Sequence, residues 1–127
     1  MAGCHKPSLQ AIDRDFKHVF GIALPQTKTI QISYVTFGDS HGDYALYAVA
    51  SLSDKDFENM QLAFDAFRTI DTQSFSNDYY PEIVQYFRRA SKAFECSVPS
   101  CLGKCAFLPA TKQIAFTIEY QCCPTRT

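Results

Sequence analysis

Residues 29–56 read TIQISYVTFGDSHGDYALYAVASLSDKD and contain two β-rich stretches separated by a polar turn. The first stretch, Thr29–Phe37, is rich in β-branched and aromatic residues, and residues 44–52 are apolar enough to return as a second strand. Residues 38–43 between them tolerate the backbone conformations of a turn. Residues 53–56 then have the hydroxyl and carboxylate spacing of a helix capping box. This order predicts an antiparallel hairpin followed by a helix.

Alternation along two strands predicts which side chains share a face. In the first strand, Ile30, Ile32 and Tyr34 are expected to lie together. Near the C-terminus the expected buried series is Ile114, Phe116, Ile118 and Tyr120, and the expected solvent-facing series is Ala115, Thr117, Glu119 and Gln121. A sheet built from such strands has one face packed on the core and one face in water.

Apolar residues at helical spacing predict three helices. The first follows Ser8, a residue type that caps helix N-termini, and ends at Gly21. The third has Pro81 in its first turn, where the missing N–H costs nothing. The expected buried stripes are Leu9, Ile12, Phe16, Val19 and Phe20; then Phe57, Met60, Phe64, Phe67 and Ile70; and finally Ile83, Phe87, Ala90 and Phe94.

One short pattern occurs twice, as LPQTKTIQIS at residues 24–33 and as LPATKQIAFT at residues 108–117. In each copy a proline-initiated turn leads into a strand. If both are hairpin corners, residues 20–24 and 105–108 are short strands that enter them. The helices beside the two copies do not align at the same offset, so the repeat indicates shared turn chemistry and no duplicated domain.

The 127 residues fit a single domain, residues 1–127, with 46% hydrophobic and 20% charged residues. The order of elements predicts an α+β fold. We expect a small antiparallel sheet of four to five strands, covered on one face by two to three helices. A net charge of −1 argues against general nucleic-acid binding. The chain shows no secretory leader and no apolar run long enough to cross a bilayer, so we expect a cytoplasmic protein with no membrane association.

Six cysteines are present, and five of them fall in the last quarter of the chain. Three interpretations of these cysteines remain open: buried thiols that act as small hydrophobic groups, disulfides, and a zinc site. The candidate zinc ligands are Cys96, Cys101, Cys105 and Cys122. Their C-x4-C and C-x3-C spacings differ from the C-x2-C knuckle typical of structural zinc sites. No cofactor is predicted.

The turn at residues 38–43 contains the side chains that could carry hydrolytic chemistry. Phe37-Gly38-Asp39-Ser40 resembles the opening block of the GDSL esterase family, which implies Ser40 as nucleophile. That family places its general-base histidine near the C-terminus, and this chain has no histidine after His41. A serine hydroxyl without a base is a weak nucleophile.

The same turn resembles the first metal-binding block of the calcineurin-like metallophosphoesterases, which implies Asp39 and His41 as ligands. The second Gly-Asp block and the downstream Asn-His block of that family have no counterpart here. Asp39, Ser40 and His41 are therefore the candidate catalytic residues, with an ordinary hairpin turn as the alternative.

Charge and tyrosine content raise the possibility of an interaction surface, with a solvated helix face, charge pairing within one subunit, or tyrosines at the edge of the core as the alternatives. Residues 39–78 hold eight acidic residues against two basic ones, whereas residues 81–127 hold six basic against three acidic. Tyrosine is common at interfaces because it buries a large area at low entropic cost. The candidate ligand- or partner-binding residues are Tyr79, Tyr80, Tyr86, Phe64 and Phe87.

Three functions remain in competition. The first is a non-enzymatic α+β interaction protein that self-associates, most simply as a homodimer. The second is a domain that binds a small apolar ligand in an aromatic pocket between sheet and helices, with rings such as Phe57, Phe64, Phe87 and Phe94 as lining. The third is a small metal-dependent hydrolase centred on Asp39, Ser40 and His41. The absence of a completed catalytic set favours a protein that is not an enzyme.

Overall fold

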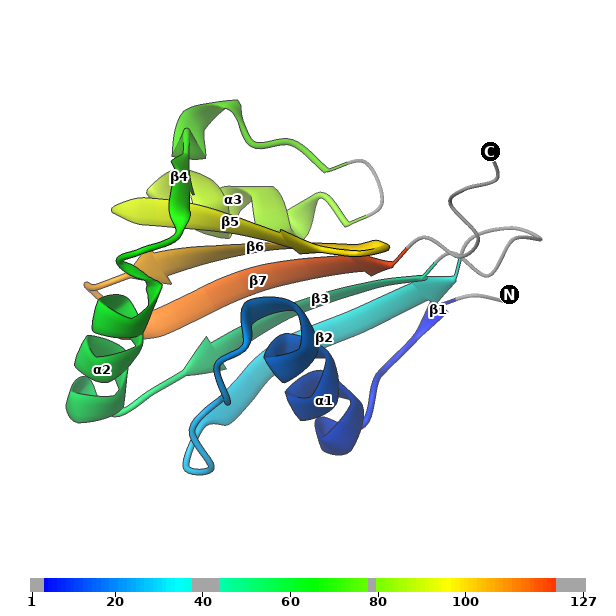
Figure 1. Ribbon diagram of the computed structural model, residues 1–127, viewed down its shortest axis with the longest axis horizontal. Coiled ribbons are helices and arrows are strands. Elements are labelled where there is room, and N and C mark those ends of the chain that lie inside the picture. Colours follow the sequence, from blue (N-terminus) through cyan, green and yellow to red (C-terminus); the bar gives the residue numbers. More distant parts are fainter. Residues whose placement is uncertain (1–3, 38–43, 78–79, 121–127) are drawn as a thin grey trace.

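The computed structural model describes residues 4–37, 44–77 and 80–120. In these residues seven antiparallel strands form one sheet in the order β1-β2-β3-β7-β6-β5-β4 (Figure 1). The strands are β1 (Cys4–His5), β2 (Thr29–Phe37), β3 (Tyr44–Ser51), β4 (Arg68–Ile70), β5 (Lys92–Val98), β6 (Cys101–Leu108) and β7 (Gln113–Tyr120). The α+β class is confirmed, and the expected four to five strands is too few.

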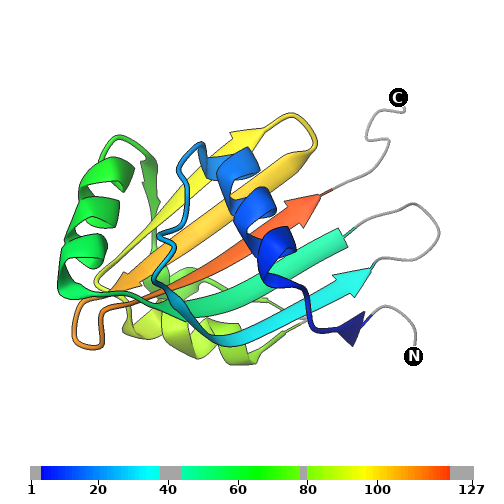
Figure 2. The same ribbon diagram turned by 90° about the horizontal axis from the view of Figure 1, so that it is seen from below.

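The helices lie on both sides of this sheet. They are α1 (Leu9–Phe20), α2 (Asp54–Phe64) and α3 (Glu82–Arg89), with a short 3-10 turn η1 (Thr72–Ser74). Figure 1 shows α1 and α2 below the sheet and α3 above it, and Figure 2 shows α1 and α2 in front of the strands. We call the two sides the α1 face and the α3 face. The prediction that all helices cover one face is wrong.

The central strands explain the covering of both faces, since both of their side-chain series are apolar. Along β3, Leu46 and Ala48 pack in the core of the α1 face and Val49 packs in the core of the α3 face. Along β7, Ala115 and Thr117 were expected to face water, yet both are buried. Small residues on the α3 face leave room for a helix to lie close to the sheet.

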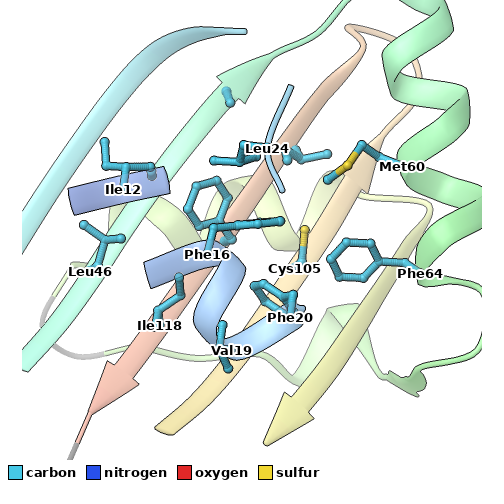
Figure 3. Close-up of a cluster of buried hydrophobic side chains, with 14 of the residues drawn as sticks. Ile12, Phe16, Val19, Phe20, Leu24, Leu46, Met60, Phe64, Cys105 and Ile118 are labelled. Atoms are coloured by element: carbon cyan, nitrogen blue, oxygen red, sulfur yellow. The ribbon is translucent and has the colours of Figure 1, made fainter. Parts of the chain in front are cut away.

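The α1 face holds the larger core (Figure 3). Ile12, Phe16, Val19 and Phe20 of α1 lie against Leu46, Cys105 and Ile118 of the sheet, with Met60 and Phe64 of α2 beside them. The Phe16 and Phe20 ring centroids are 4.6 Å apart, and Phe16 meets Phe116 edge to face at 4.9 Å. The expected stripe of α1 is buried except for Leu9, which is 59% exposed.

Local capping signals are confirmed at two of the three predicted helix starts, whereas Pro81 lies directly before α3 and not in its first turn. The Ser8 hydroxyl accepts the N–H of Ala11 at 3.1 Å, and α1 ends at Gly21, whose φ is 72°. The Ser53 hydroxyl accepts the N–H of Asp56 at 3.1 Å. The capping box is only half used, because the Asp56 carboxylate accepts a hydrogen bond from the Thr27 hydroxyl at 2.9 Å.

Two helices end earlier in the structure than the apolar spacing of the sequence predicts. α2 ends at Phe64, and Ile70 lies on β4. α3 ends at Arg89, and Phe94 lies on β5, with its side chain in the core of the α1 face. Pairing with β6 therefore draws residues 92–98 into the sheet, although their apolar spacing also fits a helix.

A bulge changes the predicted face of one β2 residue. Ile30 pairs with Ala50 and Ile32 pairs with Val49, so one extra residue, Gln31, is inserted between them. Ile30 consequently packs on the α1 face, and Ile32 packs on the α3 face. The extra residue reverses the alternation on which the prediction rested.

The repeated Leu-Pro pattern forms the same kind of turn twice. The Lys28 N–H donates to the Pro25 carbonyl at 3.3 Å, and the Lys112 N–H donates to the Pro109 carbonyl at 3.4 Å. A strand begins directly after each lysine. Residues 105–108 belong to β6 as expected, but residues 20–24 form no strand.

Candidate functional site

Three tyrosines from separate elements gather on the α3 face, beside the edge of the sheet. Tyr34 of β2 stacks on Tyr80, with ring centroids 4.7 Å apart and planes 14° apart. Tyr47 of β3 lies beneath them, 5.6 Å from Tyr80 and 6.1 Å from Tyr34. Tyr47 is fully buried, whereas Tyr34 and Tyr80 are half-buried. We call these three residues the tyrosine cluster.

The segment before α3 holds Tyr80 in this position. The Asn77 side-chain oxygen accepts the Tyr80 N–H at 2.8 Å, and the Tyr80 carbonyl accepts the Ile83 N–H at 3.1 Å. Burial, followed by the neighbouring Glu82 carboxylate, raises the pKa of Tyr80 to about 12. The exposed part of the cluster is therefore neutral and aromatic at physiological pH. Tyr86 is half-buried on α3, with the Arg89 guanidinium 5.0 Å above its ring.

Among the described residues, no strand covers most of the β2 edge next to the cluster. β1 pairs with β2 only at Val35 and Thr36. A hollow of about 420 Å³ lies along the remaining edge. Its lining is Lys28 and residues 29–33 on the strand side, and Lys6, Pro7, Leu9 and Ile12 on the helix side. Figure 2 shows β2 at this margin of the sheet, with α1 starting beside it.

The predicted aromatic residues are divided between the two faces. Phe64 belongs to the core of the α1 face and Phe87 to the core of the α3 face, and both are fully buried. Phe87 stacks on Phe75 at 3.9 Å. Since the sheet separates them, Phe64 and Phe87 do not line one pocket. Tyr80 and Tyr86 reach the surface, and Tyr79 lies outside the described residues.

A buried carboxylate on α1 was missed by the sequence reasoning. Asp15 is 2% exposed and accepts hydrogen bonds from the hydroxyls of Tyr44 at 2.6 Å and Tyr120 at 3.1 Å. The Arg14 Nε donates to the same carboxylate at 3.1 Å. Tyr44 and Tyr120 are cross-strand partners on β3 and β7. The group therefore ties α1 to the sheet. The available signal was the position of Asp15, three residues after Ile12 on the apolar stripe.

Burial and the Asp15 charge keep both tyrosines protonated. Burial, and then the hydrogen bond to Asp15, raises the pKa of Tyr44 to about 12. Burial and the Asp15 charge also raise the pKa of Tyr120. The His18 ring stacks on Tyr120 at 5.8 Å. The two neutral tyrosine hydroxyls donate to the one Asp15 carboxylate. The group is therefore a hydrogen-bonded anchor in which buried donors and acceptors have partners.

Cys96, Cys101 and Cys105 are free thiols on two neighbouring strands. Cys101 and Cys105 are buried on β6, and Cys96 is half-buried on β5. Four residues of strand separate Cys101 from Cys105 by roughly 13 Å. Two sulfurs on one zinc are at most about 4.6 Å apart, so these two do not share an ion. No group of three metal-ligating side chains occurs in residues 4–37, 44–77 and 80–120. Cys122 lies outside them.

Burial also makes the thiols of Cys101 and Cys105 poor nucleophiles. It raises the pKa of Cys101 to about 11, and it raises the pKa of Cys105 well above its ordinary value. The reactive species is the thiolate, which is scarce at neutral pH under such conditions. The other candidate chemistry, at Asp39, Ser40 and His41, falls outside the described residues and stays a prediction.

Comparisons with models of protein families, with curated proteins and with solved structures find no match. In the part of the chain that the structure describes, no helix is both long and apolar enough to cross a membrane.

Proposed function

We propose that this chain is a non-enzymatic interaction protein that self-associates as a homodimer, with the tyrosine cluster at its interface. The observation that carries this proposal is the stacking of half-buried Tyr34 on half-buried Tyr80 at 4.7 Å, with buried Tyr47 beneath them at 6.1 and 5.6 Å respectively. Tyr34 and Tyr80 are partly exposed and pack on Tyr47. Their side chains therefore offer contact area and lose little further conformational freedom when a partner binds. Interfaces use such residues as their main anchors.

The distribution of charged side chains is compatible with an interface at the tyrosine cluster. Among the described residues, the ion pairs join Lys28 to Asp13 at 2.8 Å and Arg14 to Asp15 at 3.1 Å. The acidic helix α2 and the basic end of α3 lie on opposite faces, so they do not neutralise each other. The tyrosine cluster lies away from the acidic helix, and its own side chains carry no charge.

The test is sedimentation velocity over a wide range of protein concentration. We expect the wild type to approach twice the 14.3 kDa chain mass. Tyr34→Ala should weaken the dimer at least tenfold, because loss of a central aromatic anchor costs more than about 1.4 kcal/mol. Tyr34→Phe, which keeps the ring, should retain most of the affinity.

The matched control is Leu62→Ala, which removes a 71% exposed apolar side chain from α2. It should leave the dimer unchanged. A wild type that stays at the chain mass at every concentration would refute self-association.

Two further expectations stay predictions: the cytoplasmic location and the hydrolase alternative. Evidence for the hydrolase would be turnover of an ester or phosphodiester that is lost in His41→Ala.

A further inference from the structure

The open edge of β2 has the features of an incomplete sheet. β1 covers only Val35 and Thr36, which leaves residues 29–34 beyond its reach. The backbone of an edge strand presents N–H and C=O groups that can pair with another strand. We propose that a second copy of this chain docks here by antiparallel pairing of the two β2 strands. This inference rests on the proposed self-association and specifies its geometry.

The composition of β2 supports a copy of itself as the occupant. The nine residues Thr29–Phe37 contain no charged side chain, no proline and no glycine. Natural edge strands are usually protected by charge, proline or short length. The opposite edge has such protection, since β4 is only three residues long and begins with exposed Arg68. β5 extends past β4 at charged Lys92 and at the three residues 96–98, whereas β2 is open over six consecutive uncharged residues. This difference favours coverage of the β2 edge in the assembled protein.

Within β2 itself, no charge repels a second copy of the strand. Lys28, at the start of the open segment, has a side chain only 5% exposed, and its Nζ lies 2.8 Å from the Asp13 carboxylate. Its charge is therefore already paired within one subunit. When two β2 strands run antiparallel, uncharged residues then face uncharged residues along the whole open segment.

The hollow beside the edge provides space for the second strand's side chains. It measures about 420 Å³, within the range of protein binding pockets. Its helix side includes Leu9, which is 59% exposed, and buried Ile12. Side chains that the second β2 projects toward the α1 face would cover Leu9 and extend the apolar core beyond the single chain.

Symmetry places the two-fold axis between Gln31 and Ile32, at the middle of the open segment 29–34. An axis perpendicular to the sheet makes the strands antiparallel and puts both α1 faces on the same side. Tyr34 then lies across from Thr29, the first residue of the other β2. The bulge at Gln31 shortens the regular ladder, so the tyrosine cluster supplies side-chain contacts that the backbone pairing lacks.

The experiment compares Gln31→Lys with Asn59→Lys. Both positions are exposed, so both variants should fold as the wild type does by circular dichroism. Gln31→Lys places two like charges beside the axis and should weaken the dimer at least tenfold in sedimentation velocity. Asn59→Lys adds the same charge on α2, away from β2, and should leave the dimer unchanged.

Hydrogen exchange of the backbone amides supplies the second readout. Amides of residues 29–34 should become protected as the wild-type concentration rises through the dimerisation range, while those of β4 should not change. A dimer that is insensitive to Gln31→Lys, with no added protection at 29–34, would overturn edge pairing and leave self-association standing. A wild type that remains monomeric, with or without a small molecule retained in native mass spectrometry, would overturn both.

Discussion

At Gly103 the side chains of α1 lie close to the sheet backbone, and alanine there should destabilise the protein. A Cβ at Gly103 would lie 2.7 Å from Cζ and 3.0 Å from Cε1 of Phe20, and 2.9 Å from Cγ1 of Val19. These separations are shorter than carbon–carbon contact distances near 3.5 Å. Inserting a methyl group into a filled core costs about 1–3 kcal/mol, which is the destabilisation expected for Gly103→Ala.

The Phe20 ring has little freedom to move away. It is 4% exposed and packs against Phe16 at 4.6 Å and Phe64 at 5.1 Å. Shortening the side chain should therefore relieve the clash. In a Phe20→Leu background, Gly103→Ala should cost at least about 1 kcal/mol less than in the wild type, a coupling typical of residues in direct contact.

Urea denaturation followed by far-UV circular dichroism measures this, because the chain has no tryptophan for fluorescence. Ser97→Ala, at an exposed position on neighbouring β5, is the matched control and should stay within about 0.5 kcal/mol of wild type. A Gly103→Ala protein as stable as wild type, or a penalty that Phe20→Leu does not reduce, would refute the close packing of α1 on β6.

Two further predictions concern the buried polar groups. Asp15→Ala removes the acceptor of two tyrosine hydroxyls and should lower the free energy of unfolding by about 2 kcal/mol. Tyr44→Phe removes only one of these hydrogen bonds and should lower it by about 1 kcal/mol. Equal effects of the two variants in urea titrations would contradict the anchor role of Asp15. Stability should also fall between pH 10 and pH 12, because folded Tyr44 and Tyr80 keep their protons to about pH 12 whereas unfolded tyrosine loses its proton near pH 10. Unfolding free energies that do not decline over this interval would contradict the raised pKa values.

The sequence predicted part of the proposed interaction surface. Tyr80 and Tyr86 were expected to be exposed for binding, and both reach the surface. Tyr34 was assigned only to a strand face, and its stacking on Tyr80 was not foreseen. The two residues are far apart in the chain, and the β2 bulge that helps to set the face of Tyr34 has no clear sequence signal. The open edge was also unforeseen, since it depends on the order of strands in the sheet.

Local signals determined the parts of the fold that depend on neighbours in the chain. Ser8, Gly21 and Ser53 set helix ends because a side-chain hydroxyl or a left-handed backbone acts within about four residues. Thr29–Phe37 was predicted with its exact bounds, because β-branched residues and a preceding turn act over the same short range.

Tertiary structure decided the rest. Ile70 and Phe94 have helical spacing in the sequence, but strand pairing with distant residues places both in the sheet. Which face α3 covers depends on central strands that are apolar on both sides. Asp15 could be placed on a buried stripe, yet its partners Tyr44 and Tyr120 lie 29 and 105 residues away. Hydrogen bonds and packing of this kind form only when the sheet is assembled, so no stretch of sequence contains them.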